Sequence, residues 1–98
     1  MNLMKNKIST KDSSLSKLAE QTKRIKNFTV RYQLYVSYFE THQEYYITLT
    51  KAENGIDIDT STIKNFTSNE KEALKIYQAL IDGNVTPMCL EDCVLELL

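Results

Sequence analysis

The chain of 98 residues has no tryptophan, one proline, two glycines and one histidine. Two glycines are too few for a phosphate-binding glycine-rich loop, and neither GxGxxG nor a Walker pattern occurs. The single histidine, His42, lies between Thr41 and Glu44 in a predicted turn, which favours a solvated side chain over an acid–base catalyst. We therefore expect a protein that is not an enzyme, with no catalytic residue and no cofactor.

Long apolar runs are also missing. No stretch approaches the ~20 apolar residues of a membrane span, and no apolar run of signal-peptide length follows the lysine-rich start. The two cysteines, Cys89 and Cys93, do not form the disulfide framework of a small secreted protein. These features predict a cytoplasmic protein without membrane contact and without a disulfide.

Cys89, Cys93 and Glu96 are spaced to share one edge of a predicted helix, where they could supply part of a zinc site. No fourth ligand is evident in the sequence. Cys93 also lies beside an apolar stripe, and a buried cysteine commonly packs as a small hydrophobic residue. We interpret both cysteines as structural and expect no metal site.

The net charge of −1 conceals an asymmetry along the chain. Residues 1–26 hold seven Lys or Arg and two acids, whereas residues 27–98 hold five and eleven. Residues 1–12 carry few apolar groups, which predicts a disordered basic arm. The remainder, 13–98, is long enough for a single domain with a modest core.

The clearest helix signals lie in the last third of the chain. Thr67 and Glu70 have the spacing of a capping box. An apolar stripe at the helical period ends at Gly83, the residue that commonly terminates helices in a left-handed conformation; its members are Ala73, Leu74, Tyr77, Leu80 and Ile81. Pro87 is typical of a first helical position. The sequence predicts helices over 68–82 and 87–97.

Ahead of these helices the apolar period changes from 3.6 to 2. Residues 28–39 alternate, 45–50 are β-branched and aromatic, and Ile56 and Ile58 form a third alternating run. Asn54-Gly55 is the favoured dipeptide of a two-residue hairpin turn. We predict a three-stranded antiparallel meander over 28–60, followed by a bulge or break in 59–62.

The segment 13–26 is predicted to be an amphipathic helix because its apolar residues recur at helical spacing. The apolar residues are Leu15, Leu18, Ala19 and Ile25, and Thr22 falls on the same helical stripe. The predicted fold class is therefore α+β: a three-stranded antiparallel meander packed against two C-terminal helices, with an N-terminal amphipathic helix after the disordered start.

If the C-terminal helices cover one face of the meander, the other face carries Arg31, Tyr35, Phe39 and Tyr46. This face is more aromatic than a solvated sheet face usually is. The helix over 13–26 could fold back on it, or another protein could dock there. The sequence leaves both alternatives open.

Two motifs support a family resemblance. Gly55-Ile56-Asp57-Ile58 follows a tyrosine-rich hairpin, and Pro87-x-x-Leu90-x-Asp92 opens the last helix. With these motifs the chain resembles a family of small uncharacterised proteins, a domain of unknown function, from clostridia and related Firmicutes, over about residues 28–98. The resemblance implies the α+β fold and a bacterial cytoplasmic setting, and it transfers no activity.

The sequence thus favours a small non-enzymatic module that binds another protein, as a regulator, adaptor or inhibitor, through Arg31, Tyr35, Phe39 and Tyr46. The alternative is a nucleic-acid-associated protein in which the basic segment 5–26 contacts phosphates. The residues of that alternative are Lys11, Lys17, Lys23, Arg24 and Lys26. Self-association remains a further possibility.

Overall fold

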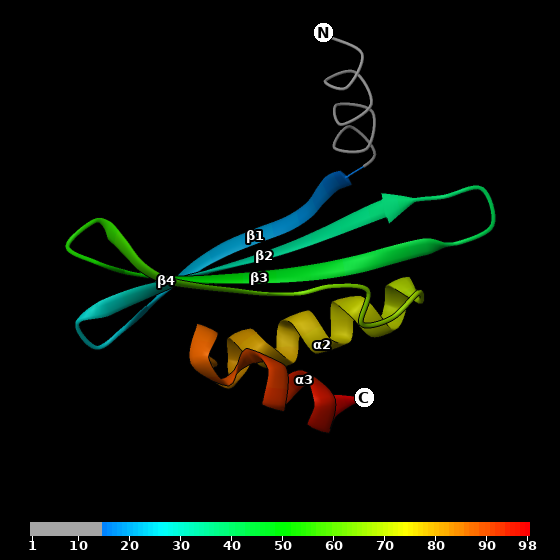
Figure 1. Ribbon diagram of the computed structural model, residues 1–98. Coiled ribbons are helices and arrows are strands. Elements are labelled where there is room, and N and C mark those ends of the chain that lie inside the picture. Colours follow the sequence, from blue (N-terminus) through cyan, green and yellow to red (C-terminus); the bar gives the residue numbers. More distant parts are fainter. Residues whose placement is uncertain (1–14) are drawn as a thin grey trace, which may run out of the picture.

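The computed structural model describes residues 15–98, which form a sheet followed by helices. The elements are β1 (Leu15–Ile25), β2 (Phe28–Tyr38), β3 (Gln43–Glu53), β4 (Ile56–Ile63), α2 (Glu70–Asp82), the 3₁₀ turn η1 (Pro87–Cys89) and α3 (Leu90–Leu97). The helices lie together against one face of the sheet (Figure 1). The arrangement is α+β, with a sheet layer and a helix layer.

The sheet is an antiparallel meander in which each strand pairs with the next along the chain, in the order β1-β2-β3-β4. Glu53 pairs with Ile56 across a two-residue turn. Both turn residues have positive φ, 53° at Asn54 and 79° at Gly55. The hairpin predicted from this dipeptide is confirmed, because Asn and Gly tolerate the left-handed backbone that the turn requires.

The predicted N-terminal helix over 13–26 is wrong, and so is the predicted three-strand count. Leu15–Ile25 is an edge strand that pairs with β2 from Leu15 opposite Ser37 to Ile25 opposite Phe28. Its apolar spacing also fits a helix, and the inward positions of this strand include the polar Gln21 and Lys23, which hides the period of 2. Pairing with β2 satisfies the backbone groups on one side of β1 and overrides local helix propensity.

This correction removes one of the two alternatives for the aromatic face. Because residues 15–25 extend the sheet sideways, they cannot lie over it as a helix. The disordered arm expected over 1–12, and residues 13–14, lie outside the described residues.

The hydrophobic core lies between the sheet and the two helices. Alternate residues of β2 and β3 point toward the helix layer, as the period of 2 requires. The buried residues are Val30, Tyr32, Leu34, Val36, Tyr45, Ile47, Leu49, Ala73, Ile76, Tyr77, Leu80, Ile81, Leu90 and Val94. The predicted helical stripe is correct except at one position: Leu74 is 43% exposed, and the buried residue on that turn is Ile76.

Helix α2 begins two residues later than the predicted capping box. The N-cap is Asn69, whose side-chain oxygen accepts from the Glu72 backbone N–H at 2.8 Å. Thr67 instead supports the cap: its hydroxyl accepts from the Asn69 N–H at 3.1 Å and donates to Glu72 Oε1 at 2.6 Å. Both threonine and asparagine are good caps, so the sequence did not decide between them.

Asn69→Ala is expected to lower the free energy of unfolding by about 1 kcal/mol, because the Glu72 N–H loses its acceptor. The measurement is equilibrium denaturation in urea. The control is Ser68→Ala at the adjacent exposed residue, which should change stability by less than about 0.5 kcal/mol. Equal losses from the two variants would contradict this assignment of the cap.

Helix α2 ends in a Schellman motif centred on asparagine rather than on the predicted glycine. Gly83 has φ −88°, and Asn84 takes the left-handed conformation at φ 55°. The Asn84 N–H donates to the Ile81 carbonyl at 3.1 Å and the Val85 N–H to the Leu80 carbonyl at 3.0 Å. These two bonds satisfy carbonyl groups that a helix end otherwise leaves free.

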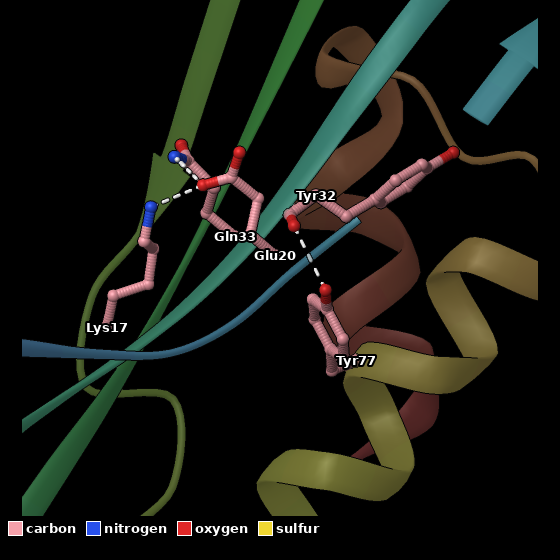
Figure 2. Close-up of polar contacts among 5 residues, drawn as sticks. All are labelled: Lys17, Glu20, Tyr32, Gln33 and Tyr77. Atoms are coloured by element: carbon pink, nitrogen blue, oxygen red, sulfur yellow. Dashed lines mark hydrogen bonds and ion pairs between the residues drawn. The ribbon is translucent and has the colours of Figure 1, made fainter. Parts of the chain in front are cut away.

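Two buried tyrosines tie the sheet to the helix layer. The Tyr77 hydroxyl on α2 donates to the Tyr32 carbonyl oxygen at 3.0 Å (Figure 2). The Tyr32 hydroxyl donates to the Val85 carbonyl at 2.9 Å, just beyond the end of α2. Burial raises the pKa of Tyr32 to about 12. Each hydroxyl therefore has a backbone partner, as buried polar groups require.

The last helix begins close to where the sequence predicts it. Pro87 is buried at the start of η1, which continues directly into α3. β4 has a bulge, but the predicted position in 59–62 is wrong, because those residues pair in regular register. The register shifts earlier, between Lys51 opposite Asp59 and Ala52 opposite Asp57. Ile58 is therefore the extra residue, and it is half exposed. No helix among residues 15–98 is long and apolar enough to cross a membrane.

Candidate partner-binding face

The sheet surface that points away from the helices is called the open face. The residues that β-strand alternation and register place on it are Lys17, Glu20, Thr22 and Arg24 of β1, Arg31, Gln33 and Tyr35 of β2, Tyr46, Thr48 and Thr50 of β3, and Asp57, Thr60 and Thr62 of β4. No described element lies over it (Figure 1).

Three of the four predicted partner-binding residues meet on this face. Tyr35 and Tyr46 lie directly opposite each other on the two central strands, and Arg31 lies two pleat repeats further along β2, beyond Gln33 and opposite Thr50. Two residues along a strand on one face are about 7 Å apart. Tyr35, Tyr46 and Arg31 are partly buried by their neighbours, so their rings and guanidinium lie along the sheet rather than in free solvent.

Phe39, the fourth predicted residue, does not lie on the sheet. β2 ends at Tyr38, and Phe39 begins the β2–β3 loop, where its ring stacks on His42 with centroids 5.0 Å apart. The Phe39 N–H donates to the His42 carbonyl at 2.8 Å, which closes the loop. The sequence analysis extended the alternating pattern to residue 39 and so placed Phe39 on the open face. The pattern does not show that the strand ends at Tyr38.

His42 lies in an exposed loop, as predicted. Its Nδ1 is 3.1 Å from the Thr41 hydroxyl and its Nε2 is 3.1 Å from Glu44 Oε2. These are contacts between neighbours in sequence, and together with the Phe39 stack they hold the loop closed. They do not direct the imidazole toward the open face residues on β2 and β3.

Two pairs of opposite charges form on the open face, and Arg24 takes part in neither. Lys17 forms an ion pair with Glu20, and Gln33 Nε2 donates to the same Glu20 oxygen at 3.1 Å (Figure 2). The hydrogen bond from Lys17 lowers the pKa of Glu20, and the same bond raises the pKa of Lys17. Arg31 reaches across β3 to Asp57 of β4, with Nη2 and Oδ2 3.4 Å apart. The face is thus close to locally neutral.

The tyrosine pair is anchored at one ring. The Tyr46 hydroxyl donates to Glu44 Oε1 at 3.1 Å. Burial, and then this bond to Glu44, raises the pKa of Tyr46. The Tyr46 phenol is therefore held neutral and fixed in direction. The rings of Tyr46 and Tyr35 offer contact area to a partner at a low cost in conformational entropy.

Threonines form rows beside the tyrosines, and sequence reasoning did not single them out. Thr48 and Thr62 have their hydroxyls 2.9 Å apart, and the Thr60 hydroxyl donates to that of Thr50 at 3.4 Å. The available signal was a Thr-x-Thr pattern at 48–50 repeated at 60–62. Thr50 is buried, whereas Thr60 and Thr62 are exposed and Thr48 is partly exposed. The accessible methyl groups for contact with a partner are therefore those of Thr48, Thr60 and Thr62.

The residues of the nucleic-acid alternative do not form a single surface. Lys11 lies outside the described residues. Lys17 and Arg24 lie on the open face, but Lys23 points to the helix layer, where its Nζ donates to the Ile81 carbonyl at 2.7 Å. Lys26 occupies the β1–β2 turn at φ 57°. Lys23, which the charge pattern predicted to contact phosphates, therefore bonds to the C-terminal end of α2.

The cysteines lie in the helix layer, away from the open face. Cys93 is partly buried against the core, as the structural interpretation expects, whereas Cys89 is exposed and does not pack as a buried hydrophobic residue. Burial is the largest of the effects that raise the pKa of Cys93. Within residues 15–98 no three His, Cys, Asp or Glu side chains are grouped closely enough to hold a metal ion.

A groove of about 430 Å³ runs between α2 and α3. Its lining residues are Lys71, Glu72, Lys75, Ile76, Ala79 and Leu97. None of the residues predicted from sequence to bind a partner lies in it. The groove lies in the helix layer, so the sheet separates it from the open face.

Comparison with known proteins assigns the chain to a family but does not assign an activity. A family model described as a family of unknown function (DUF6514) matches residues 10–98. No curated protein and no solved structure matched the chain. The matched range includes β1, which the resemblance over 28–98 left out.

Proposed function

We propose, for a chain that belongs to a family of unknown function (DUF6514), a role as a non-enzymatic module that binds another protein through its open face. The observation that supports this role is the tyrosine pair: Tyr35 and Tyr46 are directly opposite on the two central strands, on a sheet face without a described covering layer. Aromatic residues and arginine are enriched in the energetically dominant parts of protein interfaces.

The electrostatics of the face favour a protein partner over a nucleic acid. Lys17 is paired with Glu20 and Arg31 with Asp57, so two of the cations that would contact phosphates already have acidic partners. Binding through phosphates requires cations that release counterions. A flat, nearly neutral face with aromatic and hydroxyl groups instead resembles the core and rim of a non-obligate protein interface.

The setting of this interaction is part of the proposal. We place it in the cytoplasm of a clostridial or related bacterium, which is the setting that the sequence resemblance implies. In that setting the module acts as a regulator, adaptor or inhibitor of its partner.

The proposal is tested with a photo-crosslinking amino acid, p-benzoylphenylalanine, placed at Tyr46 and, as a control on the helix layer, at exposed Leu74. Irradiation in cells should give a protein adduct specific to the Tyr46 position, which mass spectrometry identifies. Purified adduct partner should then bind the Tyr35→Thr, Tyr46→Thr double variant at least about 30-fold more weakly than wild type. Threonine keeps β propensity, so the sheet is retained.

Glu91→Ser, on exposed α3, is the matched binding control and should leave the affinity unchanged. Unfolding curves of the variants separate lost contact from lost fold. The same adducts at positions 46 and 74, or full affinity in the double variant, would exclude the open face. RNA or DNA adducts at Tyr46 would favour the nucleic-acid alternative.

A further inference from the structure

We propose that β1 is the contact through which two copies of this chain form a two-fold symmetric dimer, joining their sheets edge to edge. This inference concerns the edge of the sheet and is independent of what binds the open face. The partner that fits the edge is a second copy of the chain, because the acidic and basic side chains of one β1 can face those of opposite charge on another antiparallel β1.

The edge formed by β1 is free in the described structure. β1 pairs with β2 on one side only, and no strand among residues 15–98 pairs with its other side. A row of unpaired backbone N–H and C=O groups is a template for another strand. The helices pack on one face of the sheet and not beside this edge: η1 contacts β3 and β4, α3 contacts β4, and α2 contacts β2 and β3. At β1, Lys23 reaches the end of α2 from the inner face.

The two edges of the sheet differ in their protection. β4 has a bulge at Ile58, flanked by Asp57 and Asp59, and these are features that discourage edge pairing. The register shift in β1 lies between Lys17 and Ala19, so the stretch from Ala19 to Ile25 is regular. A seven-residue regular strand is long enough to pair with another chain.

A lysine that points inward on an edge strand usually blocks pairing, because its ammonium group needs water at the edge. Lys23 is such a residue on β1. Its Nζ, however, donates to the Ile81 carbonyl at 2.7 Å, at the C-terminal end of α2. The charge is therefore satisfied inside one copy, and this obstacle to pairing is removed.

Symmetry restricts how two β1 strands can pair. A two-fold axis that relates antiparallel strands of one sheet is perpendicular to the sheet, and residues directly opposite each other then lie on the same face. An axis beside Glu20 would oppose two glutamates, and an axis beside Lys23 would oppose two lysines. An axis beside Thr22 opposes Glu20 of each copy to Arg24 of the other.

The register centred on Thr22 supplies partners that the single chain lacks. Arg24 has no ion pair or hydrogen bond from its side chain among residues 15–98. Glu20 accepts from Lys17 and Gln33 at Oε1, which leaves Oε2 for the second copy's Arg24. Opposite charges facing each other across strands stabilise a pair, and like charges destabilise it.

Such a dimer has one eight-stranded sheet with both helix layers on the same side. The two open faces then form one continuous surface, in which the Tyr35–Tyr46 pairs of the two copies are related by the axis. A partner that is itself a two-fold dimer could engage both pairs at once.

Charge reversal tests the proposed register. Analytical ultracentrifugation of the full chain should show a concentration-dependent dimer. Glu20→Arg alone and Arg24→Glu alone should each raise the dimer dissociation constant about tenfold or more, since two like-charge pairs arise per dimer. The double variant restores opposite charges and should return to within about threefold of wild type. A wild-type protein that stays monomeric to millimolar concentration, or single reversals without effect, would overturn the proposal.

Disulfide trapping tests the same register without altering its charges. In a background of Cys89→Ser and Cys93→Ser, Thr22→Cys places one thiol on the axis, opposite its copy, at a separation compatible with a disulfide. Oxidation should yield a covalent dimer. The control, Thr48→Cys, lies on the same face but on β3 and should remain monomeric. Equal crosslinking of both variants, or none at Thr22→Cys, would refute the Thr22 axis.

Discussion

Leu80→Ala is expected to lower the free energy of unfolding by about 3 kcal/mol, because a fully buried leucine leaves a cavity between the sheet and α2. Leu74→Ala, one and a half turns earlier on the same helix, should cost less than about 1 kcal/mol, since Leu74 is 43% exposed. The sequence pattern placed both leucines in one apolar stripe. Comparing the two variants therefore tests whether the energetic cost follows the burial in the structure or the position in the stripe. Equilibrium denaturation in urea measures both.

The loss at Leu80 is large against the 5–15 kcal/mol that stabilises a typical domain. A lower midpoint with an unchanged urea dependence would show that the fold is kept and weakened. Similar losses from Leu74→Ala and Leu80→Ala would contradict the orientation of α2 on the sheet.

The second large effect is a loss of stability at high pH that depends on Tyr32. Burial raises the pKa of Tyr32 from 10.0 to about 12, so the folded state holds the phenol proton more tightly than the unfolded state. The resulting stabilisation is complete below pH 10 and is lost as the pH rises from 10 to 12. We expect this residue to account for about 1–2 kcal/mol of the loss.

Tyr32→Phe isolates this contribution, because phenylalanine keeps the ring and cannot ionise. The variant should begin about 1 kcal/mol less stable at pH 8, since the Val85 carbonyl loses its donor. Between pH 10 and 12 its stability should then fall less steeply than that of wild type. Tyr38→Phe, at a residue that is 57% exposed, is the control and should follow wild type. Parallel pH profiles for wild type and Tyr32→Phe would contradict the assignment.

The central strands and both C-terminal helices could be predicted from sequence, because their local signals and their packing agree. β2 and β3 alternate between the core and the open face, and Asn54-Gly55 fixes the hairpin after them. In these segments turn chemistry, β propensity and burial all favour the same structure, which is the condition for a reliable prediction.

β1 could not be predicted because its structure depends on β2. Its composition favours a helix, and it is held extended by ten residue pairs with a strand that is already part of the core. Lys23 adds to the difficulty, since a lysine bonded to a helix end resembles a solvated lysine in sequence. Two single positions were missed for a similar reason. Packing decides that Asn84 rather than Gly83 takes the left-handed conformation and that the bulge of β4 lies at Ile58.

The open face was predicted in part. Arg31, Tyr35 and Tyr46 lie on the same face of the sheet, as alternation requires. Phe39 does not, because β2 ends at Tyr38. The ion pair between Arg31 and Asp57 spans β3, which lies between them. It depends on the position of the bulge in β4, which the sequence did not predict.

The order of the elements along the chain has a consequence for synthesis on the ribosome. Every strand precedes both helices, and the three hairpins form locally through short connections, which favours rapid pairing. The sheet is therefore complete while Leu34, Ile47 and Leu49 still lack the helices that bury them. Until α2 and α3 leave the exit tunnel, the nascent chain presents an apolar sheet surface to which a ribosome-associated chaperone would bind.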